Sequence, residues 1–321
     1  MKILFIAPTY RGGIGGHAFR VAEKLREIGF DVKLMDVPKI PIKNLKNPSF
    51  ILFSTIKAII SKEKFDVVHA FNVPSAFAMR YVRAKKKVLS VHGVYSEQIS
   101  SIHSDATSSL VNLLESRILK WADKLTTNSK HVQKIYKEKY DLDFEYLLGP
   151  IDIEKFKGVE AEILESNENQ IIYIGRDSPE KGIDILKSIE KQIKGKVVYC
   201  TNIEWKKAMS ILKSSNVLVL PSRMESIPNV IKEAFFLKVP VVATNVGGIP
   251  EIVTHEKTGL LVPPNEPKSL ANAINHLLEN PEYAKKLAEE AHKFLLNNLT
   301  WDVLLPKYIK FYEDLVKEGK M

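Results

Sequence analysis

The chain has one cysteine, no long apolar run and no low-complexity segment. Cys200 stands alone among 321 residues, which excludes an internal disulfide and a cysteine-based zinc site. The start, MKILFIAPTY, lacks a charged leader followed by an apolar region and a cleavage site, so no secretory signal is expected. No apolar run is long enough to span a bilayer. These absences predict a cytoplasmic protein.

Acidic residues are scarce in the first half of the chain. Residues 1–150 hold 24 Lys and Arg against 14 Asp and Glu, whereas residues 151–321 hold 23 against 24. A basic half favours an acidic partner such as a lipid phosphate or a membrane surface, although many lysines are equally typical of a heat-adapted protein. No nucleic-acid motif accompanies this charge, so we expect no nucleic-acid partner.

Residues 40–64 are both basic and apolar. This composition predicts a helix that either packs into the core or contacts lipid. The lipid alternative would make the protein peripheral at the inner membrane face, through its basic N-terminal domain.

Strand-like and helical patterns alternate along the chain. The first series includes KILFIA, a helix from Ala18 to Ile28, a helix near 49–62, DVVHA and KVLSVHG, and a second series starts at NQIIYIG. Such alternation predicts an α/β protein with parallel sheets covered by helices on both faces. The polar segment GPIDIEKFKGVEAEILESNE suits a boundary, giving domains of residues 1–152 and 153–302. Residues 303–321 predict a final amphipathic helix, with a break or kink at Pro306.

Two glutamates follow the apolar strand NVLVL. Glu225 lies at the carboxyl edge of this strand, and Glu233 lies about one and a half turns into the next helix. Eight residues span about 12 Å along a helix, so the two carboxylates would grip different parts of one ligand. After the next strand, the amides of Gly247 and Gly248 can approach an anion or a sugar.

Two cations follow the strand IIYI at another carboxyl edge. Arg176 and Lys181, in GRDSPEKG, are placed to stabilise a departing diphosphate, because fixed positive charge offsets the negative charge that develops on the leaving oxygen. Nearer the N-terminus, Gly15 and Gly16 open a helix and offer amides to a diphosphate.

The glycine loop has a second interpretation. Residues Gly13 to Ala18 also match GxGxxA, and Asp36 ends the next strand, so an NAD-dependent oxidoreductase is an alternative.

Three histidines and one aspartate pair complete the candidates. His92 lies at the end of a strand, directly before Gly93. For His69 and His17, a structural role and a functional role are both alternatives. The Asp-x-Asp sequence at 141–143 looks like a metal signature, but it lies away from the other motifs, and we expect no metal there.

Six features follow one another along the chain in a characteristic order. They are the glycine loop, ESRILKWADKLTTNS, PIDIEKF, IGRDSPEKGID, the Glu-x7-Glu block formed by Glu225 and Glu233, and the final helix. That order resembles the retaining glycosyltransferases of family 4, which have the GT-B fold. The resemblance implies two Rossmann-like domains facing a cleft, with the last helix crossing back to the first domain. It also implies hexose transfer from a UDP- or GDP-sugar to a hydroxyl of a glycan, small-molecule or lipid-linked acceptor, without a metal ion or other cofactor. A GT-B phosphorylase or a nucleotide-sugar epimerase is a further alternative.

The resemblance also assigns roles. It implies that His92 approaches the transferred sugar, Glu225 binds the sugar hydroxyls, Glu233 binds the ribose diol, and Arg176 and Lys181 hold the diphosphate. The remaining residues expected to bind the donor are Gly15, Gly16, Ile227, Pro228, Asn229, Gly247 and Gly248. One departure from the family pattern lies between Cys200 and Asn216, where a βα unit that helps to form the nucleobase pocket is missing.

Overall fold

The computed structural model describes residues 1–10, 13–38, 40, 42, 45–93, 114–162 and 169–317. It divides into two compact units. Unit 1 comprises Met1–Gly149 and Leu305–Met321, and unit 2 comprises Pro150–Leu304. The sequence placed these boundaries after residue 152 and before residue 303.

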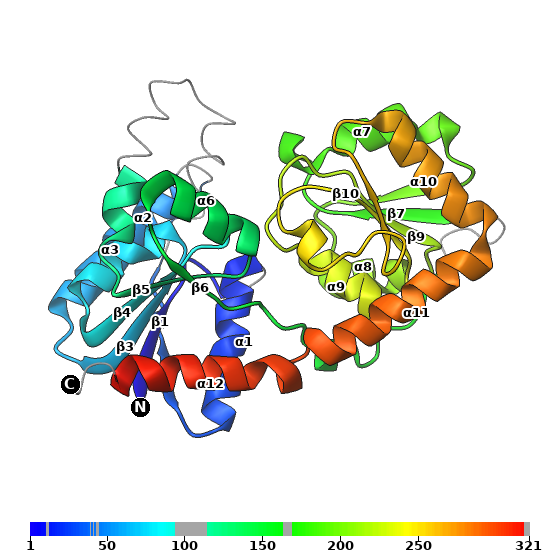
Figure 1. Ribbon diagram of the computed structural model, residues 1–321. Helices are drawn as coiled ribbons and strands as arrows, with labels where there is room; N and C mark the ends of the chain where they lie inside the picture. The colour runs from blue at the N-terminus through cyan, green and yellow to red at the C-terminus, as the bar shows by residue number, and fades with distance from the viewer. Residues whose placement is uncertain are drawn as a thin grey trace. The chain divides into compact units, whose positions relative to one another are not determined.

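Unit 1 contains one six-stranded parallel sheet with helices on both faces (Figure 1). Its strands lie in the order β2-β1-β3-β4-β5-β6. The elements are β1 (Lys2–Ile6), α1 (Gly13–Glu27), β2 (Asp31–Leu34), α2 (Lys46–Ile60), β3 (Lys64–Phe71), α3 (Val73–Tyr81), β4 (Arg83–Ser90), β5 (Lys124–Thr127), α6 (Lys130–Tyr140) and β6 (Phe144–Tyr146). Residues 114–119 are also helical.

The helix expected from Ala18 begins earlier, at Gly13. Its first turn can form there because Gly15 lies against the backbone of Thr9, where an added Cβ would be 1.7 Å from the carbonyl oxygen. The glycines predicted as a loop are therefore the first turn of α1, apart from Gly12, which lies outside the described residues.

Unit 2 contains a five-stranded parallel sheet in the order β11-β10-β9-β7-β8. Its elements are η1 (Ile153–Phe156), β7 (Gln170–Ile174), η2 (Pro179–Lys181), α7 (Ile183–Ser188), η3 (Glu190–Gln192), β8 (Lys196–Cys200), α8 (Trp205–Lys213), β9 (Val217–Leu220), α9 (Asn229–Phe236), β10 (Val241–Thr244), η4 (Ile249–Glu251), β11 (Leu260–Val262), α10 (Pro267–Glu279) and α11 (Pro281–Asn298). Only α8 connects β8 to β9, at the place where the sequence predicted a missing βα unit.

Each sheet has one topological switch point, where the order of its strands reverses. In unit 1 the chain moves from β1 to β2 on one side and then to β3 on the other, and in unit 2 it moves from β7 to β8 and then to β9. Ligands of open α/β sheets bind outside the carboxyl ends of the strands at such points. We therefore expect ligands to bind at the segments that follow β1, β3, β7 and β9.

The final helix, α12 (Trp301–Lys317), carries the chain from unit 2 back to unit 1. It continues through Pro306, so the predicted break does not occur. A proline removes one intrahelical hydrogen bond, and packing of the following turns compensates. Tyr308 and Tyr312 from those turns are buried in unit 1. Residues 318–321 of the predicted helix lie outside the described residues.

None of the helices in the described segments is both long and apolar enough to cross a bilayer. The cytoplasmic location stays a prediction.

Candidate active site

Three neighbouring strands of unit 2 carry most of the predicted site residues at their carboxyl ends. Arg176 and Lys181 follow β7, Glu225 follows β9, and Gly247 with Gly248 follows β10. Because β10, β9 and β7 are adjacent and parallel, these segments meet at one edge of the sheet, around its switch point. Lys181 and Glu225, which are 44 positions apart in the sequence, are thereby brought into contact.

Lys181 and Glu225 form the central ion pair of this edge. Lys181 Nζ lies 2.5 Å from Oε1 of Glu225, and Ser222 Oγ donates to the same oxygen at 3.1 Å. The lysine side chain is 21% exposed and the glutamate side chain 9% exposed. An ion pair in such a sheltered place is screened less by salt than a surface pair. Its two charges are fixed in position before any ligand arrives.

Glycines bring the three loops into contact. Gly247 has a φ of +56°, and a Cβ there would lie 1.8 Å from the carbonyl oxygen of Glu225, which also accepts a hydrogen bond from the Gly248 amide at 3.3 Å. Gly182 has a φ of +64°, and its Cβ would lie 2.0 Å from the carbonyl oxygen of Pro221. Only glycine fits these close backbone approaches.

Arg176 differs from Lys181 in exposure. Its side chain is 74% exposed and pairs with Glu180, with 2.9 Å between Nη2 and Oε1. Its carbonyl oxygen accepts a hydrogen bond from the Tyr173 hydroxyl at 2.7 Å. Burial, together with the charge of Glu225, raises the pKa of Tyr173, so the hydroxyl stays a donor. The arginine backbone is thus fixed while its guanidinium faces solvent.

Three more predicted residues lie at the start of α9. Ile227 and Pro228 are buried, Pro228 is the residue that precedes the helix, and Asn229 is exposed as its first residue. The first turn of a helix has free amides, which suit an anion or a hydroxyl.

Glu233 has a partner that the sequence did not predict. Trp205 Nε1, from the start of α8, donates to Oε1 of Glu233 at 2.8 Å. The indole is packed edge-on by Phe156 at 5.1 Å between centroids, and Lys155 Nζ lies 5.9 Å from the ring centre. No spacing in the sequence links Trp205 to Glu233, because the contact depends on how α8 packs against α9. Ser222, by contrast, precedes Glu225 by three residues and could have been found from the sequence.

In unit 1, the predicted residues after β1 and β4 lie close together. Gly15 and Gly16 are buried in the first turn of α1, and the next residue, His17, is 5.4 Å from the ring of half-buried His92. His17 Nε2 lies 3.1 Å from the hydroxyl of Tyr308 in α12. The structure therefore groups two of the three candidate histidines at the carboxyl edge of this sheet.

His69 belongs to a buried polar chain. Its Nδ1 lies 2.7 Å from the hydroxyl of Tyr312, and its Nε2 lies 2.7 Å from Ser90 Oγ, which in turn contacts Thr126 Oγ1 at 2.5 Å. Burial, with a smaller contribution from His92, lowers the pKa of His69 to about 3. A neutral imidazole with both nitrogens engaged ties α12 to the sheet, which favours the structural role for His69.

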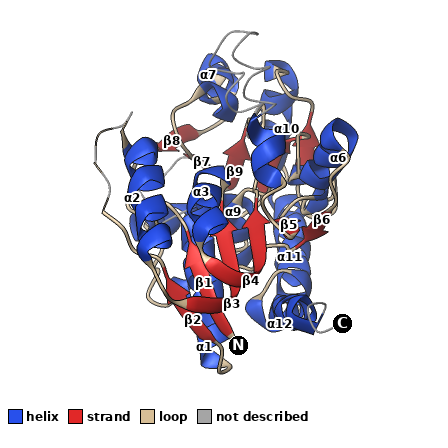
Figure 2. Cartoon of the chain, turned by 90° about the vertical axis from the view of Figure 1, so that its left-hand side faces the viewer, coloured by secondary structure: helices blue, strands red, loops and turns tan. Residues whose placement is uncertain are grey.

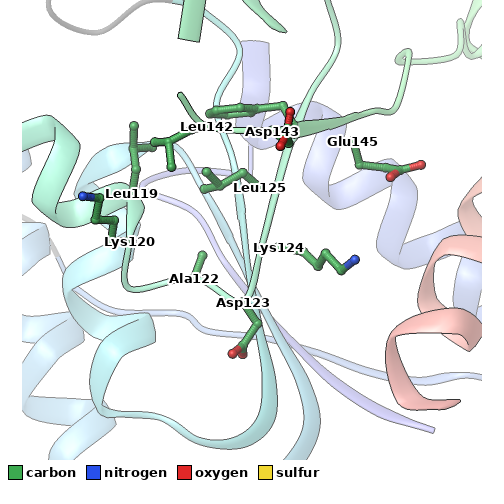
Figure 3. A pocket seen from close by; sticks show the side chains of 10 residues that line it. Leu119, Lys120, Ala122, Asp123, Lys124, Leu125, Leu142, Asp143 and Glu145 are labelled. Atoms are coloured by element: carbon green, nitrogen blue, oxygen red, sulfur yellow. The ribbon is translucent and has the colours of Figure 1, made fainter. Parts of the chain in front are cut away.

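The Asp-x-Asp sequence lies at the opposite edge of the unit 1 sheet. Asp141 and Asp143 both pair with Lys137, at 2.7 Å and 3.1 Å. Asp143 also lines a pocket whose walls include Lys124 and Phe144, the first residues of β5 and β6 (Figure 3). This pocket is therefore on the side away from the histidines. In the segments that the structure describes, no three His, Cys, Asp or Glu side chains gather as metal ligands would.

Two protein-family models match parts of the chain. The model "Glycosyltransferase Family 4" matches residues 11–155, and the model "Glycosyl transferases group 1" matches residues 186–294. The chain belongs to glycosyltransferase family 4. An uncharacterised glycosyltransferase of Methanocaldococcus jannaschii is 29% identical over an alignment of 361 positions, which covers 98% of this chain and 99% of the relative. The chain is thus a glycosyltransferase, and the oxidoreductase alternative is wrong.

Solved structures show the same fold. Sucrose-phosphate synthase from Thermosynechococcus elongatus matches with a TM-score of 0.80 at 19% identity, over 99% of each chain. Anabaena HepE, solved in complex with UDP and glucose, matches with a TM-score of 0.75 at 18% identity, over 98% of this chain and 100% of HepE. The predicted GT-B fold is confirmed.

Proposed function

We propose that this glycosyltransferase moves a hexose-type sugar from a UDP- or GDP-sugar to an acceptor hydroxyl, with retention of configuration and without a metal ion. The observation that carries the proposal is the convergence of Lys181, Glu225 and Gly247-Gly248 at the switch point of unit 2. The presence of UDP and glucose in the HepE structure supports a nucleoside-diphosphate sugar as donor.

In this proposal the cations bind the diphosphate. Lys181 is held beside Glu225 and Arg176 is exposed beside the same loop, so both can contact phosphate oxygens. When the bond between the anomeric carbon and the diphosphate breaks, negative charge develops on the leaving oxygen, and fixed cations stabilise it. Two cations in these positions would do the work for which other enzymes use a divalent ion. The amides at Gly247-Gly248 and at Asn229, with buried Ile227 and Pro228, would complete the donor site.

The two glutamates are proposed to bind two parts of the donor. Glu225 lies beside Lys181 and would accept hydrogen bonds from sugar hydroxyls, whereas Glu233, oriented by Trp205, would accept them from the ribose diol. A double-displacement mechanism needs two carboxyl groups about 5 Å apart across the anomeric carbon. Glu225 and Glu233 have separate partners on separate elements, so they are not arranged as such a pair. We therefore favour attack of the acceptor on the same face as the departing diphosphate. The acceptor proton would pass to a phosphate oxygen.

For unit 1 we propose the acceptor side, with His92 donating a hydrogen bond near the reacting carbon. Gly15 and Gly16 would present amides to the diphosphate from the start of α1. The acceptor is a glycan, a small molecule or a lipid-linked alcohol. The basic charge of this unit supports an additional peripheral contact with a membrane.

The test is a transfer assay with UDP- and GDP-hexoses and a set of alcohol acceptors. We expect nucleoside diphosphate release only when an acceptor is present, an α-linked product from an α-linked donor by NMR, and no loss of rate with a chelator. Release without an acceptor together with an epimerised sugar would identify an epimerase, and a β-linked product would refute retention.

Two lysine variants test whether the transfer reaction depends on this site. Lys181→Met should lower kcat by about 100-fold or more, the usual cost of one lost electrostatic contact in a transition state. Lys194→Met is the matched control, since Lys194 is exposed before β8, at the opposite edge of the sheet. Equal rates in the two variants would refute the proposed role of Lys181.

A further inference from the structure

Helix α2 has large apolar residues on its exposed side as well as in the core, which is unusual for a helix that packs only into a core. Its buried residues are Ser49, Phe50, Ser54 and Ala58, of which three are small or polar. Its solvent face carries Leu45, at the residue before the helix, followed by Leu52, Ile56, Ile59 and Ile60, which we call the α2 stripe. Leu45, Leu52, Ile56 and Ile59 follow one another at spacings of seven, four and three residues, and Ile60 lies four residues after Ile56, so the five side chains share one face of the helix.

The α2 stripe is well exposed. Leu52 is 56% exposed, Ile59 54% and Ile60 71%. Of the fourteen large hydrophobic residues that are exposed in the described part of the chain, seven lie within residues 40–60. An apolar patch of this kind on a folded protein marks an interaction site.

Helix α2 packs chiefly against α3 (Figure 2). By helical spacing, the buried residues Phe50, Ser54 and Ala58 lie on the side of α2 opposite to the stripe. Figure 1 shows the same two helices next to each other on one face of the unit 1 sheet. The stripe is thus a surface of unit 1 that its own main neighbour does not cover.

The charge around the α2 stripe indicates what it contacts. From Val37 to Lys62 the chain has no Asp or Glu and has five lysines, among them Lys46, Lys57 and Lys62, which are exposed. A second copy of the chain would bring lysines against lysines, which disfavours a symmetric dimer on this face. An apolar stripe flanked by lysines suits an interface of acyl chains below anionic headgroups.

We infer that the α2 stripe and its flanking lysines dock the protein on an anionic lipid surface. The leucines and isoleucines enter the headgroup and acyl boundary while the helix lies in the plane of the interface. The lysines contact lipid phosphates above them. This inference builds on the membrane contact proposed above and names its surface and lipid class, but it does not rest on the transfer reaction.

The experiment is co-sedimentation of the full chain with vesicles of phosphatidylglycerol and phosphatidylcholine, without any sugar donor. We expect binding to these vesicles, weaker binding as salt is raised, and little binding to phosphatidylcholine alone. Absence of binding to the anionic vesicles would overturn the inference.

Two variants separate the apolar and the charged contributions. Leu52→Gln/Ile56→Gln/Ile59→Gln should weaken binding by about 100-fold, since each half-exposed side chain contributes about fivefold, and glutamine preserves the helix. Lys46→Gln/Lys62→Gln should weaken it by about 25-fold, at about fivefold for each lysine.

The matched control is Ile28→Gln/Leu296→Gln, which changes two exposed hydrophobic residues outside the α2 stripe and should bind like the wild type. Equal loss in this control, or wild-type binding by the triple variant, would overturn the inference. So would a dimer in solution that the triple variant abolishes, since a second copy would then be the occupant of the stripe.

Discussion

Acidification should destabilise unit 1 through one buried histidine. The pKa of His69 is about 3 in the folded protein, whereas an unfolded histidine titrates near 6.5. Between these values only the unfolded chain takes up the proton, so stability is full above about pH 6.5 and falls as the pH is lowered toward 3. At pH 5 the loss is about 2 kcal/mol, which corresponds to roughly 4–8 °C in Tm for a unit of this size.

The assay is thermal unfolding of the wild type and of His69→Asn at pH 7.5 and pH 5. The variant keeps one hydrogen-bonding group beside Tyr312 but cannot titrate, so it should be less stable at pH 7.5 and lose about 2 kcal/mol less on acidification. His276→Asn, at an exposed position of α10, controls for the loss of a histidine in general. Identical pH dependence in the wild type and His69→Asn would refute the reasoning.

Three further outcomes follow from the geometry of unit 2. Gly247→Ala should lower Tm and abolish UDP or GDP binding in titration calorimetry, because a Cβ there meets the Glu225 backbone. The control is Gly29→Ala, where a Cβ meets no neighbour, and it should lower the free energy of unfolding only by the ~1 kcal/mol that a positive φ costs. Trp205→Phe removes the hydrogen bond to Glu233 but keeps an aromatic ring, so the nucleotide Kd should rise by about tenfold with little change in Tm; an unchanged Kd would contradict its positioning role. Burial raises the pKa of Cys200 to about 11, so a thiol reagent at pH 8 should react far more slowly with the folded protein than with the unfolded chain, and equal rates would contradict this.

The sequence predicted the parts of the fold that local patterns determine. Apolar runs such as NVLVL and VPVVAT became β9 and β10, and their positions at strand ends placed Glu225 and Gly247 at one sheet edge. Parallel pairing makes that step possible, because every carboxyl end in such a sheet points to the same side.

The sequence could not predict the tertiary contacts of the site. The partner of Glu233 is Trp205, which is 28 residues away and meets it only because α8 packs beside α9. The start of α1 was missed because glycine is a poor helix former, and the close approach of the Thr9 backbone to Gly15 is a tertiary contact that the sequence does not reveal. The sequence also left open whether α2 faces core or solvent, since Leu and Ile suit either side, and burial of Ser54 decides it.

The most direct test of the donor site on unit 2 is titration calorimetry of UDP and GDP with the wild type, Lys181→Met and Lys194→Met. We expect one of the two nucleotides to bind the wild type, a Kd about 10- to 100-fold higher in Lys181→Met because a charge-assisted contact is lost, and an unchanged Kd in Lys194→Met. Binding of neither nucleotide, or equal affinity in all three proteins, would contradict a donor site built around Lys181 and Glu225.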